Sequence, residues 1–298
     1  MSESLLAPHI AFFDSGQGGL TILEEVRKFF PGLNYTYLGD NARAPYGNKS
    51  SPTITRYTAE AALFLAGRGA QMLIIACGTA SSVAALTIQG LFRMPVVGIV
   101  EGLCQETALL LEKQPGSVAV LGTRFTTRSG RFEQELAKYG INKVWTQACP
   151  LFVPLVEEGI QEGPMVDAIA DLYLAPIPRD VQVVMLACTH YPRLAQAIAL
   201  SLYRSTGRSV VHQTIFGNKT LVDAKKDELP PIFLLDSSFA IVSQVQSFLS
   251  MQTPAQVAAL QDGSCQKLWC TDAPLHFQQV SRFFIEQALP NAEAVEII

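Results

Sequence analysis

The chain has 298 residues, a hydrophobic fraction of 49% and a formal net charge of −4. This length and apolar content argue for one or two packed domains rather than a disordered chain, and the absence of a basic excess argues against nucleic acid as a partner. The first residues lack Lys and Arg and the apolar stretch after them is cut by Asp14, so neither a secretory signal nor a membrane span is expected. Six cysteines without compact spacing predict free thiols in a cytoplasmic protein.

Apolar runs of strand length alternate with helix-like stretches. Strands are expected at 10–13, 34–38, 72–76, 96–99, 117–121, 183–187, 232–235 and 267–271, and helices at 20–30, 53–68, 132–136, 166–174, 193–202 and 277–289. Continuous Val, Ile and Leu runs are typical of strands buried on both faces. The alternation predicts an α/β fold with mostly parallel sheets covered by helices on both faces.

Two pairs of landmarks indicate an internal repeat. Asp14 and Gly122 each end an apolar run and are offset by 122 − 14 = 108 residues, while Cys77 and Cys188 are offset by 188 − 77 = 111. A nearly shared period of this length favours a duplicated domain over a solenoid. We expect two similar α/β domains with the active site in the cleft between them.

Cys77 and Cys188 each follow an apolar run, where α/β enzymes present catalytic groups at the carboxyl edge of a sheet. A thiolate is both a nucleophile and a base. Two such groups on opposite sides of one molecule would invert a stereocentre without a cofactor. The alternative is that both are small buried apolar residues, but the polar neighbours Thr79 and Thr189-His190 argue against it.

Five ordered motifs resemble those of the glutamate racemase family. They are 14–20, Gly39-Asp40 leading to Pro45-Tyr46-Gly47, 76–81, 149–157 and 187–192. The resemblance implies two α/β domains related by a pseudo-twofold, with the tail returning to the first domain. We therefore expect residues 1–99 plus 213–298 to form one domain and residues 100–212 the other.

The resemblance also implies roles for individual residues. Cys77 matches the base for the D-enantiomer and Cys188 the base for the L-enantiomer, with Asp14 assisting the first and Glu157 and His190 the second. The substrate shell would consist of Ser15, Pro45, Tyr46, Gly47, Gly78, Thr79 and Thr189. The implied partner is a small acidic amino acid, with no cofactor and no metal. The oligomeric state stays open, although a homodimer is common among such enzymes.

Gly78 departs from the family, which usually has Asn at this position. The change removes a hydrogen-bond donor and an acceptor from the pocket. We expect a cofactor-independent acidic amino-acid racemase and narrowly favour aspartate as its substrate, with glutamate racemisation for peptidoglycan as the alternative. A catalytically inactive relative that binds a protein partner is the alternative from another functional class, and the intact cysteines argue against it.

Other chemistries have less support in the sequence. Cys265, Cys270 and His276 lack a compact Cys-x-x-Cys unit and an evident fourth zinc ligand. The loop at 16–19 matches neither a dinucleotide fingerprint nor a phosphate loop, and no Gly-x-Ser-x-Gly motif of a serine hydrolase occurs.

Overall fold

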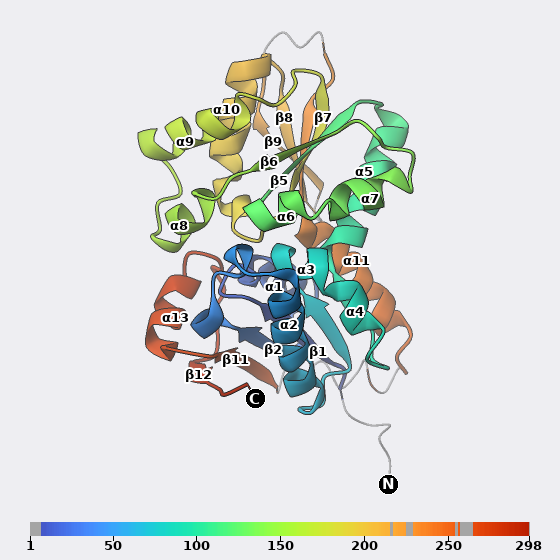
Figure 1. Cartoon of the computed structure of the whole chain (residues 1–298), viewed down its shortest axis with the longest axis vertical. Coiled ribbons are helices and arrows are strands. Elements are labelled where there is room, and N and C mark those ends of the chain that lie inside the picture. The colour runs from blue at the N-terminus through green and yellow to red at the C-terminus, as the bar shows by residue number, and fades with distance from the viewer. Residues whose placement is uncertain (1–6, 215–216, 225–228, 254–255, 257–264, 298) are drawn as a thin grey trace. The chain divides into compact units, whose positions relative to one another are not determined.

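The computed structural model of the chain describes residues 7–214, 217–224, 229–253, 256 and 265–297 (Figure 1). The chain divides into two compact units. Unit 1 comprises Met1–Ile99 and Ala240–Ile298, and unit 2 comprises Val100–Phe239. Each unit contains a six-stranded sheet.

The sheet of unit 1 has the strand order β12-β11-β2-β1-β3-β4, and all of its pairs are parallel. The strands are β1 (His9–Asp14), β2 (Asn34–Gly39), β3 (Met72–Ile75), β4 (Val96–Gly98), β11 (Gln266–Cys270) and β12 (Ala292–Ala294). The accompanying helices are α1 (Leu20–Phe29), η2 (Asn41–Arg43), η3 (Tyr46–Asn48), α2 (Ser51–Ala66), α3 (Gly78–Val83), α4 (Ala85–Gln89) and α13 (Pro274–Ser281). Apolar strands such as β1 are buried because helices cover the sheet.

The sheet of unit 2 has the order β6-β5-β7-β10-β8-β9, in which only the β8–β9 pair is antiparallel among the described strands. The strands are β5 (Ser117–Gly122), β6 (Val144–Ala148), β7 (Val181–Leu186), β8 (Val210–Thr214), β9 (Gly217–Val222) and β10 (Ile232–Asp236). The helices are α5 (Ile99–Lys113), α6 (Arg124–Arg128), α7 (Arg131–Ala137), α8 (Phe152–Glu157), α9 (Pro164–Leu174), η4 (Tyr191–Leu194) and α10 (Ala195–Thr206). Helix α11 (Ser237–Ser250) carries the chain back into unit 1.

Both faces of the unit 2 sheet are covered by helices. Figure 1 shows α9 and α10 on one side of the sheet and α5 and α7 on the other. On the α5 and α7 side, Leu103, Phe132 and Leu136 pack with Val120 and Met185 of the strands in one buried cluster. The predicted α/β fold with mostly parallel sheets is therefore confirmed.

The two sheets repeat one local strand order. Strands β2-β1-β3 lie side by side in unit 1, and β6-β5-β7 do so in unit 2. Asp14 ends β1 and Gly122 ends the equivalent β5, while Cys77 follows β3 and Cys188 follows the equivalent β7. The repeat inferred from the two sequence offsets thus corresponds to a repeated strand topology.

The boundary between the two units differs from the expected one. We expected the chain to return to the first domain at residue 213, but unit 2 continues to Phe239. The described residues between 213 and 239 lie in unit 2, because β10 is inserted between β7 and β8 in parallel register with both. The apolar stretch Ile232–Leu235 is buried there. Two predicted helices also differ at their ends: α10 begins at Ala195 after a 3-10 turn, and α13 ends at Ser281.

Candidate active site

The carboxyl edge of the unit 1 sheet brings together the residues expected there. Asp14 ends β1 in register with Gly39 of β2, and Phe13 is in register with Ile75 of β3. Because parallel strands end at the same edge, Asp14 and the residues after β2 and β3 share one side of the sheet. The backbone N–H of Asp40 donates to the carbonyl of Asp14 at 2.9 Å, which links the first two strand ends directly.

Cys77 lies between β3 and α3 and is only 5% exposed. Its Sγ is 3.4 Å from the hydroxyl oxygen of Ser15, and the Asp14 carboxylate accepts a 2.8 Å hydrogen bond from the N–H of Gly16. Burial, and then the nearby negative charge of Asp14, raise the pKa of the Cys77 thiol to about 12, although the Ser15 hydrogen bond opposes this shift. Cys77 is therefore a neutral thiol near pH 7. We call Asp14, Ser15 and Cys77 the Cys77 cluster.

The other residues expected in unit 1 lie at the start of α3 and in the turn at 45–47. Gly78 and Thr79 are buried in the first turn of α3, and the Gly78 carbonyl accepts a 2.7 Å hydrogen bond from Ser82. In the turn after η2, Tyr46 is buried while Pro45 is exposed. The hydroxyl of Tyr46 donates to Asp40, so the phenol already has a partner within the protein.

The carboxyl edge of the unit 2 sheet carries a second group. Cys188 follows β7 and is 6% exposed. Its Sγ lies 3.9 Å from Nδ1 of His190, while Nε2 of the same ring lies 3.0 Å from Oε1 of Glu157, at the end of α8. Thr189 is also buried, with its hydroxyl oxygen 3.5 Å from Nδ1. We call Glu157, Cys188 and His190 the Cys188 cluster.

His190 is held in its protonated form. Burial lowers its pKa, but hydrogen bonds and charge attraction from Cys188 and Glu157 outweigh burial and raise the pKa to about 10. Glu157 is the more accessible partner, because its side chain is 41% exposed. The Cys188 cluster therefore links a buried sulfur, through the ring of His190, to a carboxylate in contact with water.

Two buried tyrosines, which were not predicted as site residues, stabilise the loop after β1 and the loop after β7 through their hydroxyl groups. The hydroxyl of Tyr191 lies 2.9 Å from the carbonyls of Gly122 and of Cys149, at the ends of β5 and β6. In unit 1 the hydroxyl of Tyr37 donates to the carbonyl of Gly16 at 2.9 Å. Tyr191 directly follows His190 in the motif at 187–192, and this position is the sequence feature that could have identified it. Its hydrogen bonds anchor the turn that carries Cys188 and His190.

The metal and membrane alternatives gain no support from the described residues. Within them, no three His, Cys, Asp or Glu side chains are grouped as metal ligands would be, and Cys265, Cys270 and His276 are among the residues searched. In the same parts of the chain, no helix is long and apolar enough to span a bilayer. All six cysteines are free thiols.

Comparison with known proteins identifies relatives along nearly the whole chain. Residues 21–215 match the family model described as Asp/Glu/Hydantoin racemase. The glutamate racemase of Koribacter versatilis is 33% identical over 303 residues, which covers 97% of this chain and 98% of that protein. The glutamate racemase of Aquifex aeolicus is 39% identical over 219 residues, which covers 74% of this chain and 84% of the relative.

The fold comparison agrees with the sequence comparison. The crystal structure of glutamate racemase from Thermus thermophilus in complex with beta-chloro-D-alanine matches with a TM-score of 0.77 and 30% identity, covering 98% of this chain and 97% of that one. The resemblance seen in the five motifs is confirmed. The chain belongs to the glutamate racemase family, within the Asp/Glu/hydantoin racemases.

Proposed function

We propose that this chain is a glutamate racemase that needs no cofactor and uses Cys77 and Cys188 as its two acid–base groups. The observation that carries the proposal is that the equivalent strands β3 and β7 each lead into a buried cysteine with a polar partner. Ser15 Oγ lies 3.4 Å from one sulfur, and His190 Nδ1 lies 3.9 Å from the other. Two cysteines that served packing alone would not require such partners.

In the L-to-D direction, Cys188 is the base. Its thiolate takes the proton from the α-carbon of L-glutamate, so that the C–H bond breaks and an S–H bond forms. The imidazolium of His190 supplies a positive charge 3.9 Å from the sulfur while the thiolate is present. Glu157 keeps the imidazole oriented through its bond to Nε2 and provides a route for proton exchange with water.

Cys77 is the acid in the same direction. With its pKa raised to about 12 by burial and by Asp14, it holds a proton at neutral pH. Transfer of this proton to the opposite face of the α-carbon breaks the S–H bond and forms the new C–H bond of D-glutamate. Cys77, now a thiolate, is the base for the reverse reaction. Before another L-to-D turnover Cys77 must regain a proton, which Asp14 relays to it, and Cys188 must release the proton that it took.

The substrate preference rests on the relatives. The relatives over most of the chain are named glutamate racemases, and this whole-chain similarity outweighs the narrow preference for aspartate drawn from Gly78. Aspartate was therefore the weaker choice. Ser15, Gly78, Thr79 and the 45–47 turn in unit 1, with Thr189 in unit 2, would bind the carboxylates and the ammonium group of glutamate.

Activity on the two candidate substrates tests the proposal. Protein purified without pyridoxal phosphate is incubated with L-glutamate or L-aspartate, and the D-enantiomer is measured by chiral chromatography. We expect racemisation of glutamate with a kcat/KM at least about tenfold above that for aspartate, which corresponds to about 1.4 kcal/mol of discrimination. Faster turnover of aspartate would overturn the substrate, and turnover of neither would favour the inactive, protein-binding alternative.

Two matched variants test the roles of the cysteines. Cys77→Ser and Cys188→Ser each replace a thiol with a group that is a much weaker acid at neutral pH. Each should abolish turnover of both enantiomers, whereas Cys104→Ser, at a buried thiol in the core of unit 2, serves as a control. Full activity in either of the first two variants would refute the two-base proposal.

A further inference from the structure

Asp40 is a buried carboxylate at the edge that carries the Cys77 cluster. It directly follows β2 and its residue is 0% exposed. Its backbone N–H donates to the carbonyl of Asp14, so Asp40 is fixed beside one of the proposed catalytic residues. A buried charge is costly unless donors surround it, and the identity of its donors indicates its role.

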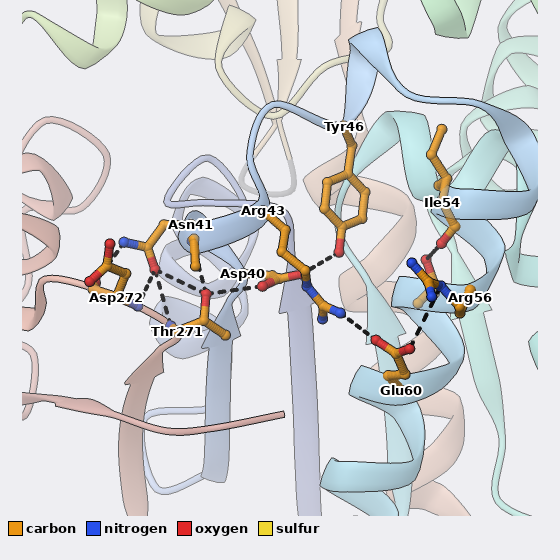
Figure 2. A network of polar contacts seen from close by, with 11 residues as sticks. Asp40, Asn41, Arg43, Tyr46, Ile54, Arg56, Glu60, Thr271 and Asp272 are labelled. Carbon is orange, nitrogen blue, oxygen red and sulfur yellow. Dashed lines mark hydrogen bonds and ion pairs between the residues drawn. The ribbon is translucent and has the colours of Figure 1, made fainter. Parts of the chain in front are cut away.

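Three segments of unit 1 supply these donors (Figure 2). Oδ2 accepts hydrogen bonds from the hydroxyl of Tyr46 and from Nε of Arg43, the latter at 2.6 Å. Oδ1 accepts from the hydroxyl of Thr271 at 2.9 Å, although Thr271 is 231 residues away in the sequence. One carboxylate thus joins the turn after β2 to the end of β11.

Outer contacts hold the donors of Asp40 in place. Arg43 also pairs with Glu60 of α2, and its guanidinium carbon lies 4.1 Å from the ring centre of Tyr57. Asn41 accepts hydrogen bonds from the N–H groups of Thr271 and Asp272 at 3.0 and 3.1 Å. Figure 2 shows Glu60, Arg43, Asp40, Thr271 and Asn41 as one continuous network from α2 to the residues after β11.

Tyr46 is the member of the network that belongs to the expected substrate shell. It is only 1% exposed, and its hydroxyl donates a hydrogen bond to Asp40. Burial and the charge of Asp40 raise the pKa of this phenol well above its ordinary value, so it stays a donor. Because its phenol is engaged by Asp40, Tyr46 has only its backbone groups to offer a ligand.

We infer that Asp40 is a positioning residue that holds the Pro45-Tyr46-Gly47 turn against the strand end of Asp14, so that the backbone of this turn binds a carboxylate of the amino-acid substrate. The inference rests on the proposed racemase function. Asp40 acts through Tyr46 and takes no part in proton transfer. Its loss should therefore weaken substrate binding far more than it slows the chemical step.

A double-mutant cycle tests the inference. Asp40→Asn, Tyr46→Phe and the double variant are compared with the wild type by measuring kcat and KM for L-glutamate, with folding checked by circular dichroism. Each single variant should raise KM by about tenfold and change kcat by less than about threefold. The double variant should be no worse than the more impaired single variant, because both changes break the same contact. Asp272→Asn is the control, because the Asp272 carboxylate accepts a hydrogen bond from the N–H of Ala273 and does not contact Asp40 or Tyr46 in the described hydrogen bonds.

Thr271 provides a second, milder pair of variants. Thr271→Val removes one donor to Asp40 and should raise KM by about threefold, while Thr271→Ser keeps the hydroxyl and should restore the wild-type value. This pair decides the question if Asp40→Asn fails to fold. The inference is overturned if Asp40→Asn leaves KM unchanged, if the two single effects multiply in the double variant, or if Thr271→Val behaves like the wild type. A wild-type protein that does not racemise glutamate would instead refute the proposed function.

Discussion

The proton on His190 depends on two partners of unequal strength. Glu157→Gln keeps an acceptor beside Nε2, where the present distance is 3.0 Å, but removes the negative charge. Because the Glu157 side chain is 41% exposed, water screens this pair. An exposed pair of this kind contributes about 0.5–1 kcal/mol, so the substitution should lower the pKa of His190 by about 0.4–0.7. Cys188→Ser removes the buried partner and should lower this pKa further.

NMR titration of protein with 13C-labelled histidine measures the pKa of His190 directly. The chain has four histidines, and a His190→Gln variant identifies the resonance of His190. In the wild type we expect the ring to remain protonated through neutral pH and to titrate near the pKa of about 10.

The same titration has a consequence for stability. Since the pKa of His190 is raised in the folded protein, its contribution to stability is complete below pH 6.5 and is lost as the pH rises through about 10. Urea unfolding at several pH values checks this sign. Titration of His190 in the wild type at or below 6.5 would refute the reasoning, as would a larger effect of Glu157→Gln than of Cys188→Ser.

Three further substitutions have defined outcomes. Asp14→Asn removes a charge that raises the pKa of Cys77, so iodoacetamide should label Cys77 faster at pH 8 by peptide mass spectrometry; unchanged labelling would contradict this. Gly78→Asn should lower KM for L-glutamate by restoring an amide to the pocket, and Gly78→Ala is the control, whose equal effect would argue against the amide. Tyr191→Phe removes the hydroxyl donor shared by two carbonyls, each of which keeps a backbone N–H donor, and should lower the free energy of unfolding in urea by about 0.5–1.5 kcal/mol, whereas wild-type stability would show that this anchor is dispensable.

Strands that are marked by a continuous apolar run in the sequence could be predicted from the sequence alone. Residues 72–76 before Cys77 and residues 183–187 before Cys188 are all apolar, as expected for strands buried on both faces, and each run ends at a reactive side chain. The α/β class and the repeated topology follow from such runs. The motif resemblance also named the members of both clusters.

Features that depend on distant contacts could not be predicted in this way. The apolar stretch of β10 is compatible with either sheet, and only its pairing with β7 and β8 places it in unit 2. Strand β9 is mostly exposed, so it lacks the apolar run of a buried strand. The link from Asp40 to Thr271 spans 231 residues and leaves no local pattern.

The most direct test of the central claim is to follow deuterium at the α-carbon during early turnover of L-glutamate in D2O. Because Cys188 removes the proton and Cys77 delivers a different one, newly formed D-glutamate should carry deuterium while the remaining L-glutamate keeps its protium. Equal initial rates of deuterium uptake into both enantiomers would contradict the two-base account, as would a failure to form D-glutamate.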